Sequence, residues 1–251
     1  MRESGAALVA TLGINKGINV LDLGCGDGTT AIPAAKLGAN VLGVDIAANL
    51  VKAGNERAIT AELKNCVFQE GDASNLINLD DQSFDLVVTI FGAMFSSNPD
   101  AVAKELVRVT KPGGKIVMGN WIPGDPTLVA QILKVSSAFT PPPPEGFISP
   151  MLWGVEDKVT ERFVQAGIPA ANIGFEKATF TFSGPFPPSA LVNIFRSYYG
   201  PTMNAFEAAE KNGQAAELYQ QLTDLFNSQN KNGSEAPTSI PATFLKVTVK
   251  R

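Results

Sequence analysis

Hydrophobic and polar residues in the first half of the chain follow two different periods. Short apolar, β-branched runs predict strands at 19–23, 40–44, 66–70, 84–90 and 114–121. Apolar residues at helical spacing predict helices between them, at 29–37, 48–61 and 99–109. Strands that alternate with helices in this way predict right-handed βαβ units. We therefore expect a mainly parallel sheet with helices on both faces.

The pattern changes after residue 121, and two proline-rich stretches, 140–146 and 183–189, interrupt it. The rest of the chain is predicted to form helices at 155–167, 189–199 and 202–228 and strands at 172–182 and 242–250. The last two strands flank a long excursion, and we expect them to lie antiparallel at one edge of the sheet. The predicted fold class is α/β: a Rossmann-like, doubly wound, seven-stranded sheet with an antiparallel last strand and helical lid insertions.

The composition limits the kinds of protein that this chain can represent. With 251 residues, 45% of them hydrophobic and 18% charged, it is typical of one globular domain. The net charge is −4 and basic residues form no run, which argues against nucleic acid or an anionic membrane as a partner. No apolar run approaches the ~20 residues that a membrane helix needs. Two cysteines and an opening "MRESGAALVA" without a signal-peptide core indicate a reduced, cytoplasmic protein.

The absence of histidine narrows the possible chemistry. The commonest general base and the commonest metal ligand are both missing. Two cysteines without a histidine do not make a typical structural zinc site, so we expect no metal. Ser-His-Asp and Cys-His catalytic pairs are also excluded.

The stretch "LDLGCGDG" joins the first predicted strand to the first predicted helix, with glycines at 24, 26 and 28. Alternate glycines let the backbone adopt positive φ and touch a ligand, and such a loop lies at the carboxyl edge of the sheet, where nucleotides bind. The dinucleotide fingerprint has a different spacing, Gly-x-Gly-x-x-Gly. A negative charge at Asp27 would repel a pyrophosphate. The loop therefore favours an uncharged or cationic ligand.

Three further acids lie at the ends of the first three predicted strands. Asp22 precedes the loop and suits a ligand amine, and Asp45 follows Gly26 by 19 residues, where a carboxylate can bind both hydroxyls of a ribose. Asp72 is placed to accept a hydrogen bond from an adenine amino group. An adenosine with an amino-acid tail, S-adenosylmethionine, fits all of these features. The alternative is a tight turn with solvated acids, which leaves the positions of the acids unexplained.

These segments resemble the motifs of class I S-adenosylmethionine-dependent methyltransferases, most closely the small-molecule, ubiquinone/menaquinone-biosynthesis-like branch. "VLDLGCGDGTTAIPAA", "VLGVDIAANLV", "GDASNL" and "FDLVVTIFGAMF" are similar to the first four motifs, and "ELVRVTKPGGKIVMGNW" is similar to the element that follows them. The resemblance covers nearly the whole chain. It implies that the cofactor contacts Asp22, Gly24, Cys25, Gly26, Asp45, Ile46, Asp72, Ala73 and Phe91.

The chain departs from the family pattern at two places. Asp27 stands where the family usually has a small hydroxyl residue. Only 18 residues precede the first predicted strand, so we expect the N-terminal helix that often covers the cofactor to be short or missing. Within a single domain at 1–251, the expected parts are a cofactor-binding core at 1–121, substrate-side insertions at 122–171 and 184–240, and closing strands at 172–183 and 241–251.

The resemblance implies an enzyme that moves a methyl group from S-adenosylmethionine to a small-molecule acceptor by in-line displacement and releases S-adenosylhomocysteine. Because the sulfonium is already an activated donor, positioning alone can lower the barrier by about 7–11 kcal/mol. A general base is needed only for a protonated acceptor, and the candidates are Tyr198, Tyr199, Glu145, Glu156 and Asp157. Aromatic side chains expected around the acceptor, each of which also fits a core role, are Phe95, Trp121, Phe147, Trp153, Tyr198 and Tyr199.

Two rival functions remain open at this point. One is a protein that binds S-adenosylmethionine or S-adenosylhomocysteine without methyl transfer, and it is motivated by the unassigned base. The other is an NAD-type oxidoreductase, which the glycine spacing disfavours. The sequence does not determine the acceptor, the atom that receives the methyl group, or whether the protein is a monomer or a homodimer.

Overall fold

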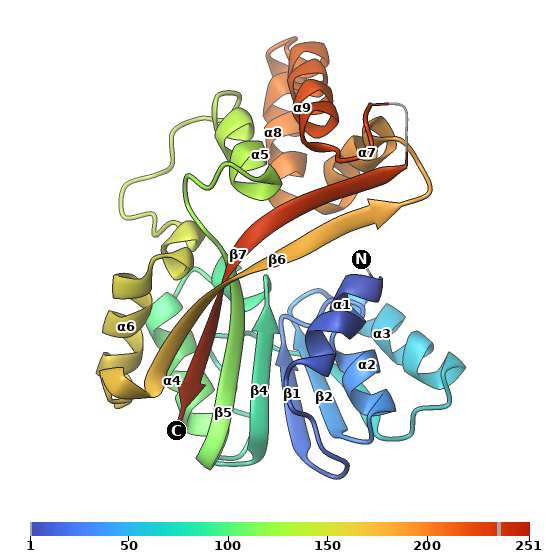
Figure 1. Ribbon diagram of the computed structural model, residues 1–251. Helices are drawn as coiled ribbons and strands as arrows, with labels where there is room; N and C mark the ends of the chain where they lie inside the picture. Colours follow the sequence, from blue (N-terminus) through green and yellow to red (C-terminus); the bar gives the residue numbers. More distant parts are fainter. Residues whose placement is uncertain (1, 235–236) are drawn as a thin grey trace. The chain divides into compact units, whose positions relative to one another are not determined.

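The computed structural model describes residues 2–234 and 237–251 (Figure 1). Its strands are β1 (Asn19–Leu23), β2 (Asn40–Asp45), β3 (Cys66–Glu70), β4 (Phe84–Ile90), β5 (Thr110–Trp121), β6 (Ile173–Gly184) and β7 (Thr238–Lys250). Its α-helices are α1 (Arg2–Ala10), α2 (Ala31–Lys36), α3 (Ala48–Thr60), α4 (Pro99–Val109), α5 (Leu128–Ser137), α6 (Glu156–Gln165), α7 (Pro188–Tyr198), α8 (Gly200–Lys211) and α9 (Ala215–Gln229). Short 3-10 helices are η1 (Ala93–Phe95), η2 (Pro150–Gly154) and η3 (Ala170–Asn172).

The seven strands form one sheet in the order β3-β2-β1-β4-β5-β7-β6. The pairs β1–β2, β2–β3, β1–β4 and β4–β5 are all parallel. The end of β7 meets the start of β5, because the Arg251 N–H donates to the carbonyl of Gly114 and the Gly113 N–H donates to the carbonyl of Arg251. This pairing makes the last strand antiparallel, so the predicted seven-stranded α/β sheet is confirmed.

By Cα proximity the chain divides into two compact units. The first unit holds the chain up to Asn120 together with Ile148–Lys177 and Leu245–Arg251, and the second holds Trp121–Phe147 and Ala178–Phe244. Helix α6, which lies in a predicted insertion, packs on α4 within the first unit. The finer division into a cofactor-binding core and substrate-side insertions stays a prediction.

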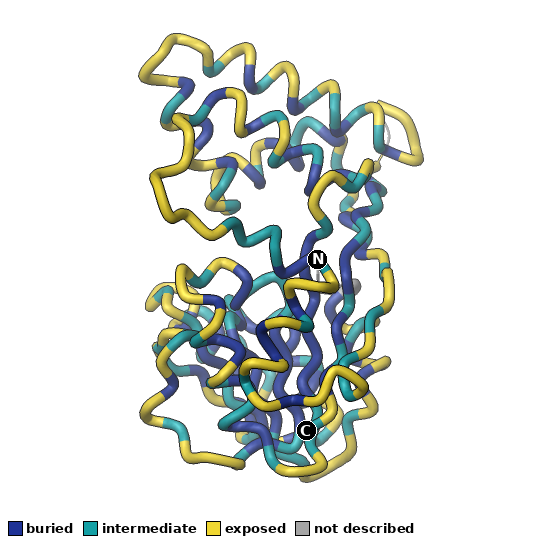
Figure 2. The backbone as a smooth tube through the Cα atoms, turned by 90° about the vertical axis from the view of Figure 1, so that its left-hand side faces the viewer, coloured by how far each residue is buried: buried dark blue, intermediate teal, exposed yellow. Residues whose placement is uncertain are grey.

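Right-handed crossovers give the first unit its two helical layers. The chain moves from β1 outward to β2 and β3, and then in the opposite direction from β4 to β5, so the connecting helices fall on opposite faces of the sheet. Helices α1, α2 and α3 cover one face, where Val9 and Val51 share a buried cluster with Val20, Val88 and Val117 of the strands. The buried residues of α4 repeat at helical spacing, as its sequence predicts. Figure 2 marks buried residues in dark blue and exposed residues in yellow along the backbone.

The second unit contains helices α5, α7, α8 and α9, which pack on one another, and the parts of β6 and β7 that belong to this unit. Aromatic rings form much of its interior. Phe195 of α7 meets Phe182 of β6 and Phe226 of α9 edge to face, with ring centroids 5.3 and 5.4 Å apart. Edge-to-face pairs of this kind stabilise a core beyond their buried area.

Several elements differ from the sequence predictions. Helices α1 and α5 were not predicted. In α5 ("LVAQILKVSS"), the buried residues Leu128, Val129, Ile132 and Ser136 recur at helical spacing, so its sequence does carry the pattern of an amphipathic helix. The single helix predicted at 202–228 is two helices, α8 and α9, because the chain turns at Gly213 with φ +72°. Strand β5 begins at Thr110 rather than at residue 114. In the described part of the chain, no helix is long and apolar enough to cross a membrane.

Candidate functional site

The carboxyl ends of the parallel strands β1 to β4 meet at one edge of the first unit. The loops that leave this edge are 24–30 after β1, 46–47 after β2, 71–83 after β3 and 91–92 after β4. Parallel sheets bind ligands at such edges, because loops converge there and backbone N–H groups of the following helices point outward. Every residue predicted to contact the cofactor lies at this edge.

Backbone hydrogen bonds tie the glycine loop to the neighbouring strand. The N–H groups of Gly24 and Cys25 both donate to the carbonyl of Val44, at 2.7 and 3.2 Å. Gly24, Gly26 and Gly28 have φ of +67°, +54° and +91°, a region that favours glycine. The loop therefore has a fixed path that a chain without these glycines would reach only with strain.

The surroundings of the three glycines differ, so each position requires glycine for a different reason. A Cβ on Gly24 would lie 2.6 Å from the Cα of Gly92, and a Cβ on Gly28 would lie 2.6 Å from the ring of Phe68. These two positions are filled by the protein itself. A Cβ on Gly26, in contrast, would have no described atom within 4 Å. Gly26 is therefore the glycine whose backbone is open to a ligand.

This difference predicts distinct effects of two alanine substitutions. Gly26→Ala is expected to lower the free energy of unfolding by roughly 1–2 kcal/mol, the cost of a left-handed residue with a Cβ, and to weaken S-adenosylhomocysteine binding roughly tenfold because the methyl group occupies ligand space. Gly24→Ala should be much less stable, since its methyl group meets backbone. Urea unfolding and calorimetric titration measure the two effects. A Gly26→Ala protein with wild-type affinity would contradict the assignment of Gly26.

Asp45 links β2 to the glycine loop through both oxygens of its carboxylate. Its Oδ2 accepts from the N–H of Gly26 at 2.8 Å, and its Oδ1 accepts from the N–H of Ala47 at 2.9 Å. Each oxygen keeps a further lone pair, so the carboxylate can still accept hydrogen bonds from a ligand. The two backbone donors fix its orientation. Ile46, the next residue, has an exposed side chain at the same edge.

Asp22 is buried beneath the glycine loop, with 2% of its surface exposed. The N–H of Ala31, the first residue of α2, donates to its carboxylate, but Oδ2 has no partner among the described residues. Burial raises the pKa of Asp22 to about 7, although the Ala31 hydrogen bond opposes this effect and the charge of Asp45 adds slightly to it. A buried carboxylate oxygen without a partner is costly, and a cationic ligand group would relieve that cost.

The side chain of Asp27 is paired, contrary to the unpaired charge that the sequence suggested. Arg57 of α3 forms an ion pair with it at 2.8 Å and also donates to its carbonyl. The argument that Asp27 repels a pyrophosphate is therefore weakened, because its charge is balanced locally. The glycine spacing remains the stronger evidence against a dinucleotide.

Asp72 and Phe91 lie at the start of the other two loops of this edge. The Oδ1 of Asp72 accepts from the N–H and hydroxyl of Ser74, both at 2.8 Å, and Ala73 lies between them in this turn. Phe91 has φ +58°, although it is not glycine, and its N–H donates to the carbonyl of Gly119 at 2.9 Å. Strained backbone of this kind costs about 1–3 kcal/mol and is concentrated at functional sites.

Comparison with known proteins agrees with this geometry. Residues 21–118 match the family model described as "Methyltransferase domain". An uncharacterised protein of Mycobacterium tuberculosis is 33% identical over 228 residues, which are 90% of this chain and 80% of that protein. The demethylmenaquinone methyltransferase of Renibacterium salmoninarum is 35% identical over 114 residues, which are 45% of this chain and 46% of that enzyme. The chain belongs to the S-adenosylmethionine-dependent methyltransferase family.

The fold of the family extends over the whole chain. A phosphoethanolamine N-methyltransferase of Haemonchus contortus, solved with phosphomonomethylethanolamine and S-adenosylhomocysteine, aligns with a TM-score of 0.59 at 19% identity. The alignment covers 99% of this chain and 52% of the nematode enzyme. At this identity the likeness shows the methyltransferase fold alone.

Two of the predicted acceptor residues, Phe95 and Trp153, belong to the first unit of this chain, and their surroundings differ. Phe95 lies in η1, directly after the β4 edge, and 41% of its surface is exposed. Trp153 is only 1% exposed, because Phe163 packs against its ring and the Arg162 guanidinium lies 4.6 Å from the ring centroid. Trp153 therefore has the surroundings of a core residue, and its contact with the acceptor stays a prediction.

The other four acceptor candidates belong to the second unit. Trp121 is buried, stacked on Phe182 and edge to face with Phe244. Burial raises the pKa of Tyr199 well above its ordinary value, so Tyr199 stays protonated and is a poor general base. Phe147 and Tyr198 are exposed.

Two residues at the cofactor edge were missed by the sequence predictions. Gly92 follows β4, and a Cβ there would lie 2.5 Å from the carbonyl oxygen of Gly24, so two glycines let the β1 and β4 loops touch. A glycine directly after a predicted strand is a signal that could have identified it. Arg57 had no such local signal, because its partner Asp27 is 30 residues away in the sequence. Among the described residues, no cluster of acidic or cysteine side chains could hold a metal ion.

Proposed function

We propose that this chain binds S-adenosylmethionine at the carboxyl edge of its first unit and transfers the methyl group to a small-molecule acceptor, leaving S-adenosylhomocysteine. The observation that supports this most directly is the Asp45 carboxylate. Two backbone N–H groups orient it, and one of them belongs to Gly26, the open glycine of the loop. A fixed carboxylate beside open backbone suits a ribose next to an uncharged or cationic tail.

Each side of the ligand has residues suited to it. Gly24, Cys25 and Gly26 border the amino-acid tail, and the unpartnered Oδ2 of Asp22 accepts from its ammonium group. Asp45 accepts from the ribose hydroxyls. The adenine is held by Asp72, by the N–H of Ala73 and by the exposed side chain of Ile46, while Phe91 follows the methionine portion.

The bound donor supplies a methyl group already activated by the sulfonium. The contribution of the chain is to hold the donor in one orientation, to bring an acceptor atom into line with the S–CH3 bond, and to exclude water. Such positioning can contribute about 7–11 kcal/mol. With no histidine and a buried Tyr199, the remaining candidate bases are Tyr198, Glu145, Glu156 and Asp157. An acceptor that is nucleophilic without assistance, such as a thiolate, an amine or an enolate carbon, needs none of them.

Calorimetric titration with S-adenosylhomocysteine tests the first step of this proposal. We expect saturable binding with one site per chain, and no binding of NAD at the same concentrations. A protein that binds NAD and not S-adenosylhomocysteine would contradict the proposal and support an oxidoreductase.

Methyl transfer itself needs a separate measurement. Incubation with S-adenosylmethionine labelled in the methyl group and a panel of thiols, amines, phenols and carbon acids should give a labelled product. Binding without any labelled product, from the panel or from cell extract, would favour a protein that binds the cofactor without methyl transfer.

A further inference from the structure

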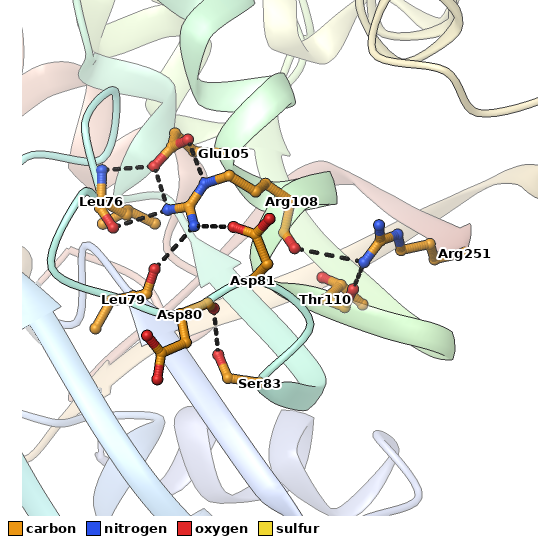
Figure 3. A network of polar contacts seen from close by, with 9 residues as sticks. All are labelled: Leu76, Leu79, Asp80, Asp81, Ser83, Glu105, Arg108, Thr110 and Arg251. Atoms are coloured by element: carbon orange, nitrogen blue, oxygen red, sulfur yellow. Dashed lines mark hydrogen bonds and ion pairs between the residues drawn. The ribbon is translucent and has the colours of Figure 1, made fainter.

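The segment between β3 and β4, residues 71–83, carries Asp72 and contains no helix or strand of its own. Two side chains of α4 hold it in place (Figure 3). The Leu76 N–H donates to Oε2 of Glu105 at 2.6 Å. Arg108 donates to the carbonyls of Leu76 and Leu79, both at 2.8 Å. Backbone hydrogen bonds hold the two ends of this segment, from Gly71 to the carbonyl of Asp45 in β2 and from Gln82 and Ser83 to carbonyls of α4. Its middle, around Leu76 and Leu79, is bound by these two side chains.

Glu105 and Arg108 also fix each other. The guanidinium donates from Nε to Oε1 and from Nη2 to Oε2 of Glu105, both at 2.8 Å, which is a bidentate pair. A third contact joins Nη1 to Asp81 at 2.6 Å. Glu105 and Arg108 are largely shielded from solvent, and the Arg108 hydrogen bond lowers the pKa of Glu105. Bidentate, partly buried pairs are stronger than ordinary surface ion pairs.

Short contacts connect this pair to Asp72. Leu76, whose N–H and carbonyl are both bound by the pair, is buried and lies four residues after Asp72. Between them, the Asn75 N–H donates to the Asp72 carbonyl at 3.0 Å, and Ser74 donates twice to the Asp72 carboxylate. Asp72 is therefore fixed from two sides: Gly71 before it donates to the carbonyl of Asp45 in β2, and Leu76 after it is placed by Arg108 and Glu105.

The pair is not needed to bury the apolar face of α4. That face consists of Val102, Ala103, Leu106 and Val109, which are buried in the core. The polar pair instead binds the backbone of Leu76 and Leu79 and the side chain of Asp81. Loss of the pair should therefore loosen residues 71–83 more than it loosens the first unit as a whole.

We infer that Arg108 and Glu105 are positioning residues for the adenine end of the cofactor, acting through residues 72–76. The inference rests on the proposed function, since it takes Asp72 and Ala73 as adenine contacts. It assigns to α4 a role in cofactor selectivity, although α4 itself makes none of the proposed contacts with the ligand.

Binding measurements with two ligands distinguish this positioning role from a role in stabilising the fold alone. S-adenosylhomocysteine carries the adenine, and S-ribosylhomocysteine has a hydroxyl group in its place. We expect Arg108→Ala to weaken binding of the first roughly tenfold, since small displacements of a contact group have effects of this size or larger, and to change binding of the second less than twofold. Arg108→Lys keeps the charge but not the fork of donors, so it should resemble Arg108→Ala.

Arg251 offers a matched control at the same corner. Its guanidinium donates to the carbonyls of Arg108 and Thr110, and no contact is drawn between it and residues 71–83 (Figure 3). Arg251→Ala should leave both affinities unchanged. Hydrogen exchange should show faster exchange of the Leu76 amide in Arg108→Ala and wild-type rates in the control.

The outcomes distinguish the two proposals. Equal loss of affinity for both ligands in Arg108→Ala, or no loss for either, would overturn the positioning role and leave the proposed function standing. Wild-type protein that binds neither ligand would overturn the proposed function and this inference with it. A loss confined to the adenine-bearing ligand supports the inference.

Discussion

Asp45→Ala is expected to weaken S-adenosylhomocysteine binding roughly a hundredfold, because hydrogen bonds to a charged group contribute about 1.5–3 kcal/mol each and two ribose hydroxyls lose their acceptor. The same change leaves the N–H groups of Gly26 and Ala47 without their carboxylate partner. The glycine loop then keeps its bonds to Val44 and the contacts of Asp27 with Arg57. Calorimetric titration measures the affinity, and unchanged affinity would mean that the ribose is bound elsewhere.

Asp85 provides a control for this measurement. Like Asp45, it accepts from a backbone N–H, that of Asn19 at 2.8 Å, and it also pairs with Lys111. It lies at the amino end of β4, opposite the ligand edge. Asp85→Ala should therefore lower the free energy of unfolding without changing the affinity. Comparable losses of affinity in both variants would show that Asp45 acts through stability rather than through the ribose.

The sequence was sufficient for the parts of the fold in which local pattern and tertiary structure agree. β1, β3 and β4 match their predicted bounds, because buried parallel strands are short apolar runs bounded by glycine or polar residues. The order of the strands was not predicted, because the right-handed crossover rule determines the hand of each connection and not which strands are neighbours. Helix α1 was not predicted. It packs closely on the glycine loop, because a Cβ on its Gly5 would lie 2.6 Å from Thr29.

The residues at the carboxyl edge of the sheet could be placed from the sequence because they lie directly after strands, where sequence position determines spatial position. Their contacts with the cofactor stay a prediction. Contacts between distant segments were not predictable in this way. The ion pair of Asp27 with Arg57, and the contacts of Arg108 with 76–81, join residues about 30 positions apart that no periodicity relates. Trp153 shows the same limit, because an aromatic residue in a loop-like segment has the same sequence signal whether it is buried or lines a site.

The second prediction with a large expected effect concerns Asp22 and the way the free energy of unfolding changes with pH. Burial raises its pKa to about 7 in the folded protein, against an ordinary value of 3.8. Between these values the folded state holds a proton that the unfolded state has released. The free energy of unfolding should therefore fall as pH rises from about 4 to about 7, by up to about 1.4 kcal/mol per pH unit, and change little above that. The nearby Cys25 thiol does not titrate in this range, because burial raises its pKa.

Binding of the ligand ammonium should reverse this preference, because a cation next to Asp22 favours the charged carboxylate. We expect S-adenosylhomocysteine to release close to one proton when it binds at pH 6, and its affinity to rise by up to about tenfold per pH unit until pH 7. Titrations in two buffers with different ionisation enthalpies measure the released proton. Asp22→Asn keeps the shape of the side chain but cannot titrate. The variant should release no proton when it binds S-adenosylhomocysteine, and it should bind this ligand more weakly than wild type at pH 8. Its free energy of unfolding should no longer fall between pH 4 and pH 7. Equal proton release in the variant and the wild type would assign the released proton to another group.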